Sequence, residues 1–236
     1  MGLRDLGIEI KISKRPLDII YMLDTSGSMD GAKIQAVNNA MHELERLLRD
    51  EAAKNPTAQV NVRIITFGGP TAKWHLRDRT DVESFRYSDI NNVAGMTPLG
   101  HALDHLSDAL SSDNMPKRGL KPIVVLMSDG QPNDDWAPSL DRFLTLPWGK
   151  KAIKVAIAIG KDADRDLLAK FTTNPELVLN ANNSTDLKSF ISWTSTLITH
   201  TSQHDSQVRD NTGKIRIDIK PPAPRTMLTD DNKEFV

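Results

Sequence analysis

The chain has 236 residues, enough for one α/β domain with a sizeable core and a small appendage. Its 30 lysines and arginines are balanced by 31 aspartates and glutamates, and the resulting net charge of −1 gives no support to a nucleic-acid-binding surface. The chain has no cysteine, which excludes disulfides, thiolate catalysis and cysteine-type zinc sites. No apolar run approaches about 18 residues, and the N-terminus lacks the apolar segment of a signal peptide. We therefore expect a cytoplasmic protein without a membrane span.

The first half of the chain predicts a strand, a helix, a second strand and an edge strand. Residues 17–23 (LDIIYML) are nearly all apolar, as expected for a central parallel strand covered on both faces. Residues 59–67 (QVNVRIITF) form the next strand, and a Gly-Gly-Pro turn leads to 72–76 (AKWHL), which we expect to pair antiparallel at an edge. Between the first two strands, residues 30–54 show helical spacing, with an apolar face of Ile34, Val37, Met41, Leu44 and Leu48.

The second half continues the alternation after an irregular stretch over 77–97. Pro98 can open a helix at its first position, and leucines at helical spacing follow it. The remaining expected elements are a strand over 121–128, a helix around 135–146, a strand over 151–160, a short helix over 164–171, a strand over 176–180 and an amphipathic helix over 187–198.

Strands and helices alternate about six times, which predicts an α/β fold. We expect a doubly wound, mostly parallel six-stranded sheet with one antiparallel edge strand and helices on both faces. In such sheets, ligands bind outside the carboxyl ends of the strands, where the strand order reverses. Only two strands end in acidic clusters, at Asp24 and Asp129. If the strand order is 3-2-1-4-5-6, these two carboxylates are neighbours.

Two aspartates in one crevice repel each other, and burial strengthens the conflict. A divalent cation resolves it, and hard oxygen ligands suit Mg²⁺, Mn²⁺ or Ca²⁺. Ser26 and Ser28 supply neutral oxygens on the loop after Asp24, and Thr97 can add another from a loop flanked by glycines. Helix capping is the alternative reading for these three hydroxyls, because serine and threonine are favoured caps.

The pattern Asp24-x-Ser26-x-Ser28, followed by Thr97 and by Asp129 in SDG, resembles the metal-ion-dependent adhesion site of von Willebrand factor A domains. The resemblance implies that Ser26, Ser28 and Thr97 bind a divalent metal, Mg²⁺ or else Mn²⁺ or Ca²⁺. It implies that Asp24 and Asp129 act largely through water and those hydroxyls. An Asp or Glu carboxylate of a partner protein would complete the shell, and the protein would not be an enzyme.

The same resemblance places the partner at the rim of the metal site. We expect the rim to be acidic, so that a partner needs basic residues around its acidic ligand. The rim residues expected to contact the partner are Met29, Asp30, Met96, Asp134, Asp135 and Trp136.

A phosphotransferase is the alternative function. LDTSGS and MSDGQPND are similar to motifs of haloacid-dehalogenase-like enzymes, in which Asp24 would be the nucleophile and Asp129, Asn133 and Asp134 would hold Mg²⁺. General enzymes of that class have a second aspartate at the position of Ser26, and this reading gives Thr97 no role.

His101 and His105 have a metal-ligand spacing on one helix. They lie opposite the leucines of that helix, so a solvated face is the favoured interpretation and zinc the alternative.

Within the von Willebrand A group, RPLDIIYMLDTSGSMDGAKIQAVNNAM and TPLGHAL look most like the bacterial TerY-type branch. That resemblance implies a tellurite-resistance or stress-response setting, with a kinase or phosphatase of the same operon as the partner. We assign residues 15–200 to the domain. Residues 1–14 and 201–236 are extensions, with strands expected at 8–12 and 214–219 and a flexible tail after the second.

Overall fold

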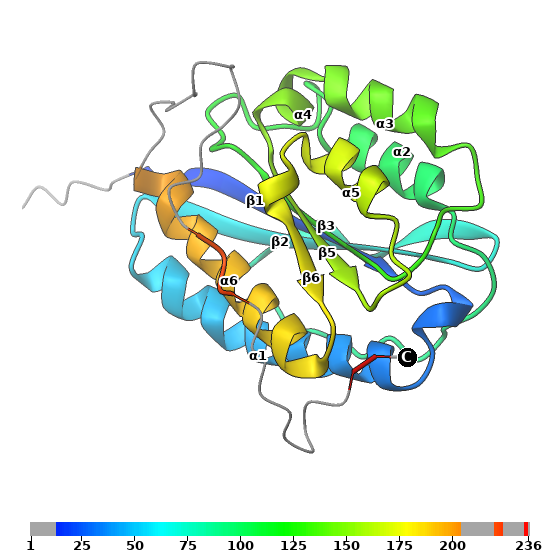
Figure 1. Ribbon diagram of the computed structural model, residues 1–236. Helices are drawn as coiled ribbons and strands as arrows, with labels where there is room; N and C mark the ends of the chain where they lie inside the picture. Colours follow the sequence, from blue (N-terminus) through cyan, green and yellow to red (C-terminus); the bar gives the residue numbers. More distant parts are fainter. Residues whose placement is uncertain (1–12, 204–219, 224–233, 236) are drawn as a thin grey trace, which may run out of the picture.

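The computed structural model describes residues 13–203, 220–223 and 234–235, and it shows a sheet between two layers of helices (Figure 1). The sheet has the order β3-β2-β1-β4-β5-β6. All neighbouring strands pair in parallel except β3, which is antiparallel to β2 at one edge. The predicted fold class is therefore confirmed. The strands are β1 (Arg15–Asp24), β2 (Ala58–Gly68), β3 (Thr71–Asp81), β4 (Ile123–Ser128), β5 (Ile153–Ile159) and β6 (Val178–Ala181).

Helices cover both faces of the sheet, as predicted (Figure 1). One layer contains the long helices α1 (Ala32–Ala53) and α6 (Ser184–Gln203), which pack against each other. The other layer contains α2 (Leu99–Ala109), α3 (Trp136–Thr145), α4 (Pro147–Lys151) and α5 (Arg165–Thr172). Two 3₁₀ turns, η2 (Gly27–Met29) and η3 (Pro175–Leu177), follow β1 and precede β6.

The apolar strand β1 explains how the layers hold together. Alternate side chains of a strand point to opposite faces, so Ile19 and Tyr21 join the core under α1 and α6, while Ile20 and Met22 join the core under α2, α3 and α5. All four are 0% exposed. Burying a large apolar side chain stabilises the fold by about 1.5–3 kcal/mol, which accounts for the nearly continuous apolar sequence of β1.

The edge strand β3 is longer than the five residues predicted for it, and it runs on to Asp81. Its pairing with β2 contains two register shifts, and the added residues are mostly charged. Arg63 of β2 donates to the Arg77 carbonyl at 2.7 Å, and Arg79 pairs with the buried Asp18 at 2.7 Å. Charged side chains and bulges are common on edge strands, where they discourage pairing with another chain.

The other differences from the sequence prediction are small. Helix α4 was not predicted and begins at Pro147, a favoured first helical position. The strands expected at 8–12 and 214–219 lie outside the described residues. Near the end of the chain, Glu234 forms an ion pair with Lys161 at 2.7 Å, and Phe235 is buried against the domain. None of the helices in the described residues is long and apolar enough to cross a membrane.

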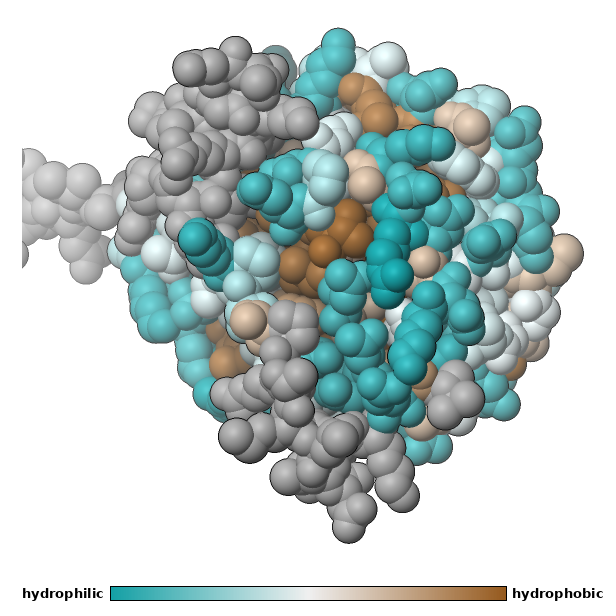
Figure 2. Space-filling model, in the orientation of Figure 1, coloured by the Kyte–Doolittle hydropathy of each residue, from teal (hydrophilic) through white to brown (hydrophobic). Residues whose placement is uncertain are grey.

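The face drawn in Figure 2 is largely hydrophilic over the helices, with hydrophobic residues gathered near its middle, around β6. This strand has four residues and forms the second edge of the sheet. Short edge strands expose few unpaired backbone groups, which limits edge-to-edge association.

Candidate metal centre

The carboxyl ends of β1 and β4 lie side by side, because the two strands are neighbours in the sheet. Asp24 ends β1 and Asp129 follows β4 directly, and their exposed fractions are 0% and 1%. Ser128 Oγ donates a hydrogen bond to Asp24 Oδ2 at 2.6 Å, so the two strand ends are also joined through side chains. The strand order on which the predicted pairing of the two carboxylates depended is therefore the one observed.

The loop after β1 connects these two aspartates through its serines. Asp24 Oδ1 accepts a hydrogen bond from the Ser26 backbone N–H at 2.8 Å. The Ser26 and Ser28 hydroxyls are 3.1 Å apart, and Ser28 Oγ donates to Asp129 Oδ1 at 2.7 Å. We call Asp24, Ser26, Ser28 and Asp129 the oxygen cluster. The structure thus brings four of the five predicted ligand residues into one hydrogen-bonded group.

Thr97, the fifth residue, is held beside the cluster by its backbone. Its N–H donates to Asn133 Oδ1 at 2.9 Å, and its carbonyl accepts from the Asn133 N–H at 3.3 Å. The neighbouring Gly95 carbonyl accepts from the Gly27 N–H at 3.1 Å, so the loop that carries Thr97 rests on the serine loop. Thr97 is 6% exposed, and its hydroxyl makes no hydrogen bond to another described residue.

Helix capping does not explain the three hydroxyls. Ser26 precedes η2 but makes no side-chain cap, and helix α1 has Gly31 at its N-cap position. Helix α2 has Pro98 at its N-cap position and likewise no side-chain cap. The hydroxyls are therefore directed toward the carboxylates or left without a partner among the described residues.

Lys33, which the sequence analysis did not select, also belongs to the site. Its Nζ donates to Asp129 Oδ2 at 2.8 Å, and its side chain is only 11% exposed. Lys33 lies one turn before Val37 and two before Met41 on the inward face of α1. A lysine at a position of the apolar stripe was the signal that could have found it.

The electrostatics of the site are unequal for the two carboxylates. Asp129 has an ammonium group at hydrogen-bond distance, whereas the carboxylate of Asp24 has hydrogen-bond donors but no cation among the described residues. Burial raises the pKa of Asp24 to about 6, and the charge of Asp129 adds to this, while hydrogen bonds from Ser128 and Ser26 lower it. A buried carboxylate without a counter-charge is a site where a cation binds favourably.

The donor set fits a hard divalent cation. It consists of carboxylate and hydroxyl oxygens, the groups that Mg²⁺, Mn²⁺ and Ca²⁺ prefer, and it has neither the thiolates nor the imidazoles typical of structural zinc. In the part of the chain that the structure describes, no three His, Asp or Glu side chains converge as a metal site. The hydroxyls are therefore required if the cluster is to hold a metal.

The two histidines of α2 lie against β3, where His101 is exposed and His105 is half-buried. His101 Nδ1 lies 3.1 Å from Thr71 Oγ1, and His105 Nε2 lies 3.3 Å from the Ala72 carbonyl. Both rings thus contact β3, and leucines of the same helix face the core.

The predicted rim divides into exposed and buried residues. Asp30, Asp135 and Met96 are exposed, and Met96 is the large hydrophobic side chain that the described residues expose most, at 53%. Asp134 and Trp136 are half-buried, and Asp134 Oδ2 accepts from the backbone of His101 at 3.3 Å.

The prediction that Met29 contacts a partner is wrong. Its side chain is 0% exposed and packs in the core under α1. The η2 turn (Gly27–Met29) points this side chain inward while it keeps Ser28 at the surface. Met29 therefore anchors the serine loop instead of forming part of its outer rim.

A cavity of about 510 Å³ lies away from the oxygen cluster, between β3 and α2. Two of its three arginines already have partners, because Arg79 pairs with Asp18 and Arg63 stacks on Trp74 at 4.3 Å. Its cations thus largely serve the fold, and we take the oxygen cluster as the functional site.

Comparison with known proteins agrees with the fold. The sequence profile of the von Willebrand factor type A domain matches residues 18–193. The chain belongs to this family. Von Willebrand factor A domains commonly bind protein ligands and a divalent metal at the metal-ion-dependent adhesion site, or MIDAS. A search of curated proteins finds no match.

Solved structures similar to this von Willebrand factor A domain come from diverse proteins. Proximal thread matrix protein 1 from the mussel byssus is 19% identical with a TM-score of 0.59, and the match covers 79% of this chain and 49% of that one. The same protein has been solved with a zinc-occupied MIDAS motif, at 18% identity and a TM-score of 0.55, covering 79% of this chain and 46% of that one.

Two microbial proteins are also similar. The ArnB paralog VWA2 from Sulfolobus acidocaldarius is 17% identical with a TM-score of 0.56, covering 76% of this chain and 45% of that one. The pilus adhesin SpaC from Lactobacillus rhamnosus GG is 17% identical with a TM-score of 0.59, covering 78% and 30%. The chain thus spans less than half the length of these proteins, and the likeness concerns the fold.

Proposed function

We propose that this protein is a metal-dependent protein-interaction module. A divalent cation, Mg²⁺ or else Mn²⁺ or Ca²⁺, would bind at Ser26, Ser28 and Thr97, with Asp24 and Asp129 behind them as a complete MIDAS. The ion would supply a Lewis-acidic position for an Asp or Glu carboxylate of the partner. The observation that carries the proposal is the buried Asp24 carboxylate, which accepts hydrogen bonds from the Ser26 N–H and the Ser128 hydroxyl but has no cation beside it among the described residues.

The residues of the proposed site have different roles. Asp24 orients the serine loop by accepting from the Ser26 N–H, and Asp129 orients the Ser28 hydroxyl. Thr97 brings a hydroxyl with no competing partner among the described residues. The exposed Met96 next to it offers an adaptable apolar contact to the partner protein.

The setting in the cell is the finer part of the proposal. The resemblance of the segments around Asp24, Thr97 and Asp129 to the TerY-type branch supports a tellurite-resistance or other stress system in the cytoplasm. Under this proposal the partner is a kinase or phosphatase of the same operon.

The direct test is calorimetric titration with Mg²⁺ and Mn²⁺. Ser28→Ala and Asp24→Asn should each weaken metal binding at least tenfold, because they remove a ligand oxygen or the uncompensated charge. Ser84→Ala is the matched control, since Ser84 is exposed beyond the end of β3 and its hydroxyl makes no hydrogen bond to another described residue. Equal metal affinity in wild type and both site variants would contradict the metal site.

The partner is tested next. Immobilised wild-type protein should retain the candidate kinase or phosphatase in Mg²⁺ and release it in EDTA, and Ser28→Ala should not retain it. A single Asp→Ala or Glu→Ala change on the partner should abolish binding. Retention at full affinity in EDTA would show that recognition uses another surface.

We further propose that the protein is not a phosphotransferase. Asp24 is 0% exposed, and its oxygens accept hydrogen bonds from Ser26 and Ser128 instead of facing solvent, from which a phosphoryl group would have to come. Asn133 and Asp134 bind the backbone of Thr97 and His101 instead of facing Asp24. Formation of an aspartyl-phosphate with acetyl phosphate and Mg²⁺, lost in Asp24→Asn, would overturn this.

A further inference from the structure

Lys33 is placed where local helix physics disfavours a lysine. It is the second residue of α1, where the positive end of the helix dipole disfavours a cation. The first turn of α1 has no acidic side chain to offset this. The ammonium group of Lys33 is instead held 2.8 Å from Asp129 Oδ2, and the Asp129 side chain is completely buried.

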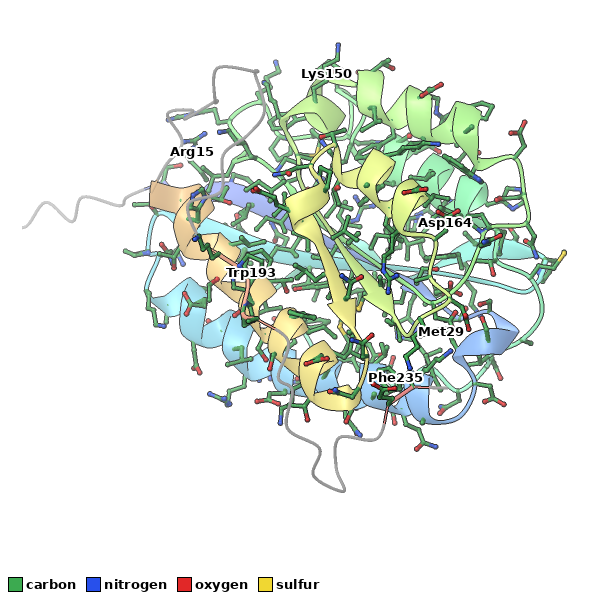
Figure 3. The ribbon with its side chains drawn as sticks, viewed as in Figure 1. Arg15, Met29, Lys150, Asp164, Trp193 and Phe235 are labelled. Carbon is green, nitrogen blue, oxygen red and sulfur yellow. The ribbon has the colours of Figure 1, made fainter. Side chains whose placement is uncertain are left out.

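The surroundings of Lys33 keep this ion pair away from water. Gly160, with a φ of +77°, follows β5 and lies so close to Lys33 that a Cβ there would be 3.7 Å from Lys33 Cε and 3.9 Å from its Nζ. The same position is 3.7 Å from Phe235 Cβ. Phe235 is 7% exposed, and its N–H donates to the Asn182 carbonyl at 2.7 Å. Figure 3 shows Phe235 and Met29 at the same end of the molecule.

The hydrogen bonds of Asp129 are therefore divided between two groups. Oδ2 accepts from Lys33, and Oδ1 accepts from the Ser28 hydroxyl at 2.7 Å. Both oxygens of this buried carboxylate are thus held by a partner, one by a cation and one by a hydroxyl. Lys33 thus holds Asp129 in the position from which it orients Ser28.

Lys33 also sets the net charge of the metal centre. Asp24 and Asp129 contribute −2 when both are ionised, and Lys33 contributes +1, so the centre carries −1. A divalent cation would change this to +1, and one partner carboxylate would bring it to zero. Without Lys33, the metal alone would neutralise the centre, and a partner carboxylate would gain less from binding.

We propose that Lys33 is a positioning residue that weakens the binding of the metal alone and strengthens the binding of a carboxylate to the metal-loaded site. This inference rests on the proposed function, because it concerns the same metal centre. Lys33 acts as a fixed counter-cation: it repels the divalent ion, and it leaves the loaded site with a positive charge that only an anionic ligand removes. Metal and partner then bind cooperatively.

The test uses the full chain and Mn²⁺ as the probe. Isothermal titration calorimetry at pH 7.5 measures the binding of Mn²⁺. Lys33→Met should bind Mn²⁺ at least tenfold more tightly than wild type, which corresponds to about 1.4 kcal/mol. Lys33→Arg should stay within about threefold of wild type, because it keeps the charge. Lys161→Met is the matched control, since Lys161 is an exposed lysine that pairs with Glu234, next in sequence to Phe235, and it should also change little.

The second readout is the binding of acetate to the Mn²⁺-loaded proteins. It is detected by the electron paramagnetic resonance of the bound Mn²⁺. Acetate should bind more weakly to loaded Lys33→Met than to loaded wild type. If Lys33→Met does not fold, Lys33→Gln replaces it, and circular dichroism decides which variant is used. A merely structural role for Lys33 would lower metal affinity together with stability, whereas the proposal requires the affinity to rise.

The outcomes also separate this inference from the proposed function. Wild type that binds Mn²⁺, with Lys33→Met binding equally or less tightly, overturns the role of Lys33 and leaves the metal site intact. Failure of both proteins to bind Mn²⁺ overturns the metal site and the role of Lys33 with it. Binding by Lys33→Met where wild type shows none supports the role of Lys33.

Discussion

Lys154 is a buried lysine whose replacement should stabilise the protein. It lies in β5 and is 5% exposed, and within the described part of the chain it donates only to the carbonyls of Gly149 at 3.1 Å and Ala152 at 3.4 Å. Among the described residues it has no carboxylate partner, and the ring of Phe143 lies 6.0 Å from its Nζ. Burial lowers the pKa of Lys154 to about 8, so the protein keeps a desolvated ammonium in its core at neutral pH.

The magnitude follows from the distance between the ordinary and the folded pKa. At 1.36 kcal/mol per pH unit, the change from 10.5 to about 8 makes the buried charge cost about 3 kcal/mol. Lys154→Met removes this cost but also removes two hydrogen bonds worth about 1 kcal/mol each. We expect the free energy of unfolding to rise by about 1 kcal/mol at pH 7.

The pH dependence provides a sharper check. Because the folded pKa of Lys154 is depressed, the unfolded chain binds more protons between pH 8 and 10.5. Above pH 10.5 Lys154 is neutral in both states and the folded protein has no charge to bury. As the pH falls from 10.5 through 8, the cost of burying the ammonium appears and that stability is lost. Relative to Lys154→Met, wild type should therefore gain stability as the pH rises from 7 to 10.

Urea unfolding in EDTA at pH 7, 8, 9 and 10 measures this difference without interference from metal binding. Lys150→Met is the matched control, because Lys150 is exposed on the adjacent helix α4, and its profile should parallel that of wild type. A Lys154→Met protein that is less stable at pH 7 by 1 kcal/mol or more, with a parallel pH profile, would refute the reasoning.

Two of three further predictions concern the metal site, and the third concerns the packing of the loop that follows β1. Thr97→Ala should fold normally and keep much of its Mg²⁺ affinity but weaken partner binding, and equal partner affinity in saturating Mg²⁺ would remove the role of its loop. Gly68→Ala should lose stability by about 2 kcal/mol or more in urea unfolding, since its Cβ would lie 2.2 Å from the Thr25 carbonyl oxygen, whereas at Gly27 the nearest atom is 3.5 Å away and Gly27→Ala should be tolerated. Mn²⁺ affinity should fall about tenfold per pH unit below pH 6, where Asp24 takes up a proton that competes with the ion, and a flat calorimetric profile from pH 7 to 5 would exclude that carboxylate as the one that the metal needs.

The fold could be predicted because its central strands are covered on both faces. Such strands need apolar residues at successive positions, and this is why the runs at 17–23 and 121–128 could be recognised without an alignment. Their alternation with helices then fixed the edge of the sheet at which Asp24 and Asp129 meet. The edge strand β3 could not be predicted in full. Its pairing with β2 has two register shifts, and the residues at its charged end do not alternate between apolar and polar.

The candidate site was predictable in its oxygens but not in its balancing charge. Serines and aspartates after apolar strands give a local signal, whereas the partner of Asp129 is 96 positions away on the first turn of α1. Its position on the apolar stripe of α1 is a sequence signal, but a lysine in the first turn of a helix fits a solvated position equally well, and the packing of α1 on the sheet decides between the two. Met29 was misread for the same reason, since the η2 turn determines which loop side chains face the core. Because that cation decides whether a bound metal leaves the site neutral or positive, the ligand of the site follows from the packing of α1 as much as from the five motif residues.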